Sequence, residues 1–160
     1  MKLKQISLFV ENKPGTVNAA LKLLANNGIN ISTLSLSDSK FFGVLRLLIR
    51  DWEKARDLLE SHDFAVKITD VVAIEVDHAA GSLSKVLEVL DRHQVNIEYL
   101  YAFAAGLHGT AAIIFRFADP DDAIERILGI RVFVKMCAPN SIPRSEGKAK
   151  RVIDRRNLNA

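Results

Sequence analysis

Two short segments of the chain carry residues that could hold a small ion. They read E-N-K-P-G-T (residues 11–16) and D-H-A-A-G-S (residues 77–82), and each precedes apolar residues at helical spacing. A helix N-terminus offers backbone N–H groups without acceptors and the positive end of the helix dipole, which suits a carboxylate. Gly15 and Gly81 have no Cβ that would block a close approach, and the neighbouring acidic and amide side chains can accept hydrogen bonds from an ammonium group. Each turn could therefore satisfy both ends of a zwitterion.

The two segments belong to an internal repeat with an offset of 66 residues. Glycine, asparagine and apolar positions agree between the copies, while surface positions differ. Matched positions are Ile6, Leu8 and Val10 with Val72, Ile74 and Val76; Gly15 with Gly81; 29–31 with 95–97; and Gly43 with Gly109. This pattern is expected when backbone requirements and core packing are duplicated.

Each copy predicts a β-α-β-β-α-β unit, from period-2 and period-3.6 spacing of apolar residues. In the first copy the predicted strands are 2–10, 30–37, 41–50 and 64–68, and the predicted helices run from near Pro14 to Asn27-Gly28 and over 52–61, with Asp51 as N-cap. In the second copy the predicted strands are 70–76, 96–104, 109–117 and 131–137, and the predicted helices are 81–93 and 120–128.

This order predicts an α+β fold of two ferredoxin-like units, each an antiparallel sheet with both helices on one face. The predicted units are residues 1–69 and 70–137, with their sheets joined edge to edge or packed face to face. Residues 138–160, rich in charge and proline, are predicted to be a disordered basic tail.

The first copy, V-E-N-K-P-G-T-V-N-A-A-L-K-L-L-A-N-N-G-I-N-I, resembles the opening of an ACT domain, a small regulatory βαββαβ module of amino-acid metabolism. The shared features are a strand, a polar residue or two, Pro-Gly, a helix and then Asn-Ile. The duplicated chain resembles small tandem-ACT proteins over about residues 1–137. The resemblance implies that a free amino acid binds at the strand–helix turn, at an interface between two ACT units.

Carried over residue by residue, the resemblance implies two sets of ligand-binding residues. The first is Glu11, Asn12, Lys13, Pro14, Gly15 and Thr16, with Asn30 and Ile31; the second is Asp77, His78, Ala79, Ala80, Gly81 and Ser82, with Asn96 and Ile97. The second turn departs from the family pattern, because Ala79-Ala80 replaces Lys13-Pro14. Either the second turn has a different specificity or it only packs against a partner.

Several of these residues could instead have a purely structural role. Gly15 and Gly81 could merely start a helix, and Asn30 and Asn96 could merely form turn hydrogen bonds. Tyr99 and Tyr101 share one strand face, and we expect them to pack within the sheet or between units rather than stack on a ligand. We expect the same of the apolar residues Leu34, Leu36 and Phe41.

Composition and missing motifs argue against several other functions. The net charge of +3 comes from the tail, which carries +4, so residues 1–137 are near neutral and nucleic-acid binding is not expected. No apolar run is long enough for a membrane span, and the single cysteine fits a reducing cytoplasm. The four histidines lack metal-ligand spacing, catalytic motifs are absent, and the acids at 119, 121 and 122 suit a helix start.

The sequence therefore predicts a cytoplasmic, non-catalytic regulatory protein that binds a free amino acid, needs no metal or cofactor, and changes the arrangement of its ACT units. A homodimer and a regulated enzyme are the expected partners. The alternative is a ligand-free interaction module that regulates an enzyme of amino-acid metabolism or a transcription factor.

Overall fold

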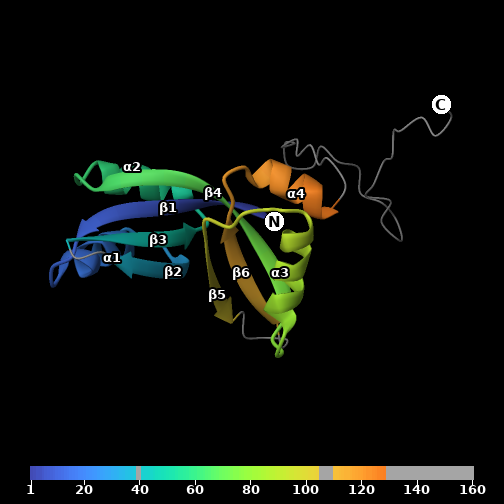
Figure 1. Ribbon diagram of the computed structural model, residues 1–160. Coiled ribbons are helices and arrows are strands. Elements are labelled where there is room, and N and C mark those ends of the chain that lie inside the picture. The colour runs from blue at the N-terminus through green and yellow to red at the C-terminus, as the bar shows by residue number, and fades with distance from the viewer. Residues whose placement is uncertain (39–40, 105–109, 129–160) are drawn as a thin grey trace, which may run out of the picture.

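The computed structural model describes residues 1–38, 41–104 and 110–128, and within them six strands form one antiparallel sheet in the order β2-β3-β1-β4-β6-β5 (Figure 1). The elements are β1 (Lys2–Glu11), α1 (Thr16–Asn26), β2 (Ile31–Asp38), β3 (Phe42–Ile49), α2 (Trp52–Glu60), β4 (Ala65–Asp77), α3 (Ser82–Arg92), β5 (Tyr99–Ala104), β6 (Thr110–Arg116) and α4 (Pro120–Leu128). The predicted α+β class and the repeated ferredoxin-like order are confirmed. The predicted strand 131–137 and the tail 138–160 lie outside the described residues.

Strand β4 joins the two units. The two strands predicted at 64–68 and 70–76 form one strand of 13 residues, because the sequence between them holds no proline or glycine that would interrupt it. Its first part pairs with β1, up to the pair Lys2 and Val72, and its second part pairs with β6, from Val72 to Asp77. The sheets are thus joined edge to edge, and the predicted boundary between residues 69 and 70 falls inside this strand.

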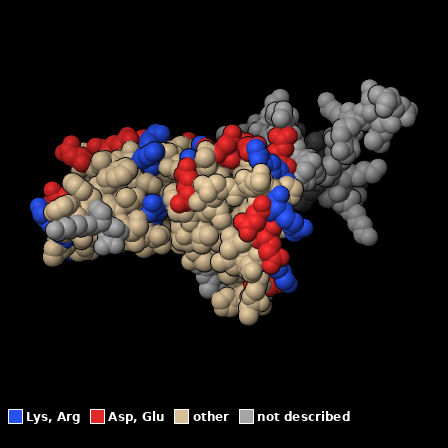
Figure 2. Space-filling view, in the orientation of Figure 1, with Lys and Arg blue, Asp and Glu red and all other residues tan. Residues whose placement is uncertain are grey.

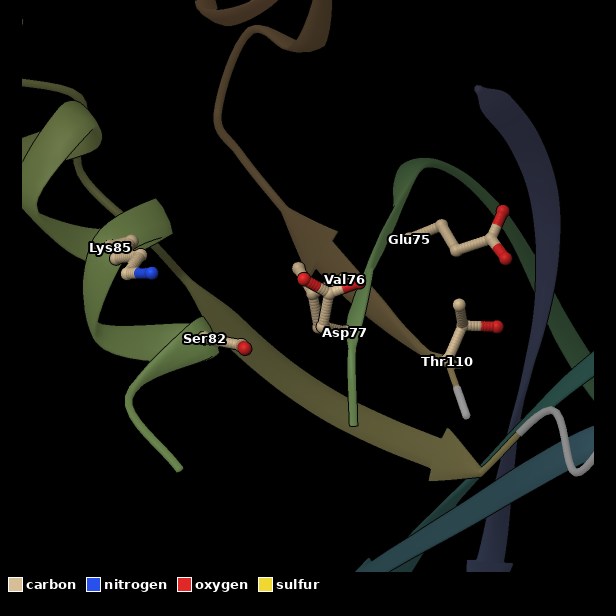
Figure 3. A pocket seen from close by; sticks show the side chains of 6 residues that line it. All are labelled: Glu75, Val76, Asp77, Ser82, Lys85 and Thr110. Carbon is tan, nitrogen blue, oxygen red and sulfur yellow. The ribbon is translucent and has the colours of Figure 1, made fainter. Parts of the chain in front are cut away.

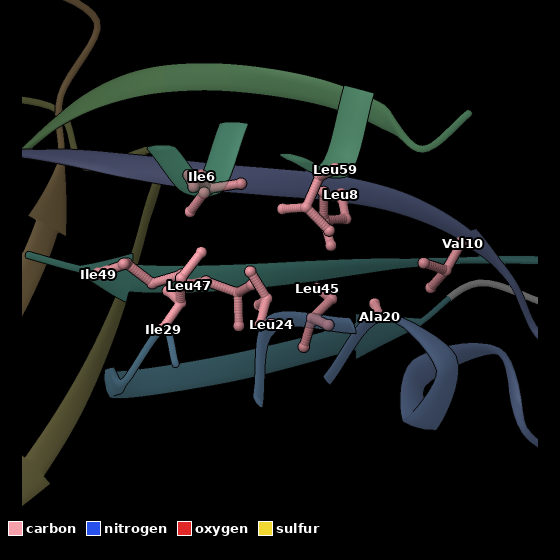
Figure 4. Packing of buried hydrophobic residues seen from close by; sticks show 11 residues of the cluster. Ile6, Leu8, Val10, Ala20, Leu24, Ile29, Leu45, Leu47, Ile49 and Leu59 are labelled. Carbon is pink, nitrogen blue, oxygen red and sulfur yellow. The ribbon is translucent and has the colours of Figure 1, made fainter. Parts of the chain in front are cut away.

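The helices cover one face of each sheet, as the alternating pattern predicts. In the first unit, Ile6, Leu8 and Val10 of β1 pack with residues of β3 against Leu24 of α1 and Leu59 of α2 (Figure 4).

In the second unit, Val72 of β4 and Phe115 of β6 pack against Leu90 of α3 and Ala123 of α4. Matched residues of the repeat thus build matched cores.

On the opposite face of the sheet, which carries no helices, strands of the two units contact each other where the units meet. β1 and β3 lie horizontally in Figure 1, whereas the antiparallel strands β5 and β6 lie more nearly vertically, and β4 bends from one direction to the other. This twist brings β5 over β1, where the fully buried side chain of Gln5 donates to the Tyr99 hydroxyl (2.7 Å) and accepts from the Tyr101 hydroxyl (3.0 Å). Tyr101 also packs beside Val71. Both tyrosines therefore make contacts between the two units.

Three boundary details differ from the prediction. Helix α1 begins at Thr16 rather than near Pro14, because Gly15 at φ 89° is left-handed and cannot belong to the helix. β5 begins at Tyr99 rather than Asn96. Asp51 occupies the N-cap position of α2 but makes no side-chain capping hydrogen bond.

The expectation that Leu34, Leu36 and Phe41 are packed is wrong for the single chain. These side chains are 47%, 51% and 68% exposed, because Leu34 and Leu36 lie on the edge strand β2 and Phe41 lies in the connection between β2 and β3. The surface over β2 and β3 is largely uncharged, whereas charged side chains gather over α2 and along α3 (Figure 2). The β2 edge is therefore an uncharged surface on which two leucines are exposed beside serines.

Candidate functional site

A hollow of about 410 Å³ lies at the predicted ligand-binding turn of the second unit. It is lined by the end of β4, the start of α3 and the start of β6, through Glu75, Val76, Asp77, Ser82, Lys85 and Thr110. Figure 3 shows Ser82 and Lys85 pointing from α3 towards the end of β4, with Glu75 and Thr110 on the other side of that strand. Of the residues predicted for this turn, Asp77 and Ser82 line the hollow.

The two turns of the repeat have the same backbone geometry. Gly15 and Gly81 precede their helices with φ of 89° and 85°. Lys13 N–H donates to the carbonyl of Glu11 (2.8 Å), and Ala79 N–H donates to that of Asp77 (2.8 Å). The alanines of the second turn therefore adopt the path that proline helps to set in the first.

Two amides at the start of helix α3 have no acceptor among the described residues. Ser82 N–H donates to the carbonyl of Ala79 (3.2 Å), and Lys85 N–H donates to that of Gly81 (3.1 Å). Within the described chain no acceptor faces the N–H groups of Leu83 and Ser84, and no side chain caps the helix. A Cβ built on Gly81 would meet nothing within 4 Å. The start of the helix is therefore open to a ligand from outside.

The charged groups of this hollow are not engaged with each other. Glu75, Asp77 and Lys85 line it, and none of the three belongs to an ion pair in the described part of the chain. An ammonium group could reach the Asp77 carboxylate, while a carboxylate could reach the free amides and the Lys85 ammonium group.

The turn of the first unit differs in its side-chain contacts, although the first amides of α1 are left without a side-chain cap just as those of α3 are. Lys13 Nζ lies 2.6 Å from a carboxylate oxygen of Glu11, and the Thr16 hydroxyl donates to the carbonyl of Lys13 (3.1 Å). Ala79 and Ser82 stand at these positions in the second unit, where the ion pair is impossible and the Ser82 side chain has no bonding partner among the described residues. The two turns have thus diverged in side chains, and the second is the more open.

The remaining predicted residues lie near the turns but do not line the hollow. Asn12, Pro14, Asn30, His78, Ala79, Ala80, Gly81 and Asn96 are exposed. Ile31 and Ile97 are part-buried and pack against the cores of their own units. In each Asn-Ile pair, the isoleucine therefore packs against the core and the asparagine is exposed.

Four residues of the hollow were missed by the sequence interpretation. Lys85 lies one helical turn beyond Gly81, so helical spacing alone could have suggested it. Glu75 and Val76 directly precede the turn. Thr110 pairs with Asp77 across the strands, which required the strand register.

Neither a metal site nor a membrane helix is found in the described residues. No group of three or more His, Cys, Asp or Glu side chains there could hold a metal ion. None of the helices described combines the length and the apolar character that crossing a membrane requires.

Comparisons with known proteins agree with the fold and its duplication. The family model described as "ACT domain pair" matches residues 1–136. Protein BT0572 from Bacteroides thetaiotaomicron is 39% identical, with a TM-score of 0.75 over 81% of this chain and 88% of that one. No curated protein matches.

Two more distant structures share the fold. The regulatory subunits of aspartate kinase from Thermus thermophilus (ligand-free form) and Thermus flavus are 15% and 16% identical, with TM-scores of 0.54 and 0.56. Each comparison covers 79% of this chain, and 91% and 90% of the respective subunit.

Proposed function

Because the chain belongs to the family of ACT domain pairs, we propose that it is a non-catalytic regulatory protein that binds a free amino acid at the turn between β4 and α3. The observation that carries the proposal is the hollow that Asp77, Ser82 and Lys85 line at the start of α3, where two helix amides and the Asp77 carboxylate have no partner among the described residues. The two predicted ACT units, 1–69 and 70–137, would be the parts whose arrangement responds to the ligand.

The ligand is held at its backbone atoms, which every amino acid shares. Its carboxylate accepts hydrogen bonds from the N–H groups of Leu83 and Ser84 at the positive end of α3. Its ammonium group donates to Asp77, and Lys85 balances the charge of the carboxylate. The side chain of the ligand then extends towards the surface that faces the turn from another unit.

The β2 edge provides a route to the homodimer. Leu34 and Leu36 are exposed on the edge strand, whose unpaired backbone groups can pair with the same strand of a second copy. We propose that the working form is such a dimer and that amino-acid occupancy stabilises one arrangement of units over another.

The regulated partner would be an enzyme of amino-acid metabolism in the cytoplasm. The fold likeness to regulatory subunits of aspartate kinase supports this class of partner. The single cysteine permits no disulfide within the chain, which suits a reducing compartment.

A thermal-shift screen of the proteinogenic amino acids, followed by titration calorimetry, tests the amino-acid proposal. At least one amino acid should raise Tm, and Asp77→Asn should weaken its binding by about tenfold or more because a charge-assisted hydrogen bond is lost. Glu88→Gln is the matched control, since it removes an exposed carboxylate from α3 outside the hollow. If no amino acid binds, or if both variants bind equally, the proposal is wrong.

The exposed β2 edge also favours the second candidate, an interaction module that needs no ligand. In that case Leu36→Lys would abolish self-association or capture of the partner, while no amino acid would alter Tm. Light scattering on the wild-type chain and on Leu36→Lys, each with and without amino acids, separates the two functions.

A further inference from the structure

A second cavity, of about 260 Å³, lies on the helix-free face where the two units meet. Its polar lining comes from Ser7, Arg46, Lys67 and Thr69 of the first unit and from Glu98, Tyr99 and Arg116 of the second. It is separate from the turn hollow, with which it shares no lining residue. We propose that this cavity binds a small, doubly charged anion, of the dicarboxylate or phosphate-ester class, that bridges the units.

The strand register places two cations around one hydroxyl. Arg46 on β3 and Lys67 on β4 both pair with Ser7 on the intervening strand β1, so the three side chains form one row across the sheet. The Ser7 oxygen accepts from the Gln5 amide (3.1 Å), so its own proton can be donated into the cavity. The row presents donors, as an anion requires.

The positive charge of this row is not compensated. Neither Arg46 nor Lys67 belongs to an ion pair in the part of the chain that the structure describes. Arg46 donates to the Ser37 hydroxyl (2.6 Å), but its Nε is buried without an acceptor. A cleft whose lining carries an excess of one sign of charge attracts counter-ions.

The second unit adds a third cation and a flat wall. The only carboxylate among the lining residues, Glu98, already pairs with Arg116 at 3.1 Å. Three cations and one carboxylate leave two positive charges, which matches a dianion. The guanidinium group of Arg46 lies over the Tyr99 ring, 4.2 Å from its centre, and is thereby held at the cavity.

Apolar side chains complete the cavity and define the ligand further. Phe9 and Val44 line it beside the cationic row. A bare inorganic ion would leave this wall unused, whereas a small organic dianion would place its carbon skeleton there. The ligand would touch β1, β3 and β4 of one unit and β5 and β6 of the other, so its occupancy would stabilise this junction.

Titration calorimetry of the full chain at low ionic strength tests the proposal, with succinate, phenyl phosphate, inorganic phosphate and neutral succinamide as probes. At least one organic dianion should bind with a Kd of about 1 mM or tighter, and succinamide should not bind. Preference for succinate would indicate a dicarboxylate ligand, whereas preference for phenyl phosphate over inorganic phosphate would indicate a phosphate ester.

Variants locate the binding. Lys67→Gln should weaken it by about tenfold or more, because a charged donor is removed. Lys67 is exposed and has no ion-pair partner among the described residues, so this change should leave the fold intact. Lys22→Gln, which removes an exposed lysine of α1, is the control of equal charge. Arg46→Gln should act like Lys67→Gln, with its melting curve recorded because a contact to Ser37 is also lost.

Two outcomes overturn the proposal. One is that no organic dianion binds the wild-type chain. The other is that Lys22→Gln and Lys67→Gln change the affinity equally, which would mean that the anions respond only to overall charge.

Discussion

The hydrogen-bond network of Gln5 should hold the two units together, and removing one oxygen atom tests this. Tyr101→Phe deletes the hydroxyl that donates to Gln5 Oε1 at 3.0 Å and leaves the ring in place. Because Gln5 is fully buried, water cannot replace the lost donor without rearrangement. A buried polar atom left without a partner costs about 1–3 kcal/mol, so Tm should fall by roughly 2–4 °C per kcal/mol in a chain of this size.

A double-mutant cycle separates the network from packing. Gln5→Leu removes the amide and with it the bonds to both tyrosines and to Ser7. In the Gln5→Leu background, Tyr101→Phe removes a hydroxyl that no longer has its partner, so its cost should nearly vanish. The expected coupling energy is about 1 kcal/mol or more, within the range for residues in one network.

Urea denaturation of the four proteins of the cycle, followed by far-UV circular dichroism, measures these quantities. Ser32→Ala is the control, because it removes an exposed hydroxyl of β2, and it should change the free energy of unfolding by less than about 0.5 kcal/mol. A coupling energy indistinguishable from zero would refute the view that this network joins the units.

Two further outcomes are expected from single residues. Burial raises the pKa of the Tyr101 hydroxyl above its ordinary value of 10.0, so the folded chain keeps this proton where the unfolded chain loses it. The contribution of this hydroxyl to the free energy of unfolding should therefore be fully present below pH 10 and should fall above pH 10 by up to about 1.4 kcal/mol per pH unit. Urea denaturation between pH 8 and 11 measures this fall, which should be smaller in Tyr101→Phe. Gly81→Ala should cost about 1–2 kcal/mol from the left-handed backbone alone, since the added Cβ meets nothing within 4 Å. Gly81→Asn should cost less in the same denaturation assay, and equal costs would contradict a backbone origin.

The fold was predictable because its signals are local and occur twice. Alternation in β1 and helical spacing in α1 each recur after 66 residues, and helices α1 (Thr16–Asn26) and α3 (Ser82–Arg92) keep that offset in the structure. The start of α1 was misplaced by the usual preference for proline in the first helical turn. In this chain the left-handed glycine after Pro14 separates the proline from the helix.

The candidate site was predictable only in the part that the sequence motif covers. The turn pattern identified Asp77 and Ser82, but Thr110 enters the hollow only through its pairing with Asp77 across the sheet. The two turns differ by the hydrogen bond from Thr16 to the Lys13 carbonyl and by one ion pair, Lys13 with Glu11. Such a pair could have been proposed from the sequence, because it spans two residues, but its geometry could not.

The contacts at the junction of the two units could not be predicted from the sequence, for a physical reason. Alternation assigns Gln5 and Ser7 to the face of β1 opposite its core residues, and two polar side chains there would ordinarily face water. Strand β4 instead runs from one unit into the other, and the accumulated twist turns part of this face into an interior. Gln5 then meets tyrosines 94 and 96 residues away, and Ser7 lies beside cations that have no carboxylate partner among the described residues. Because β4 continues without interruption from one unit to the other, the polar residues of this face point into the junction, where they form its hydrogen bonds and line its cavity.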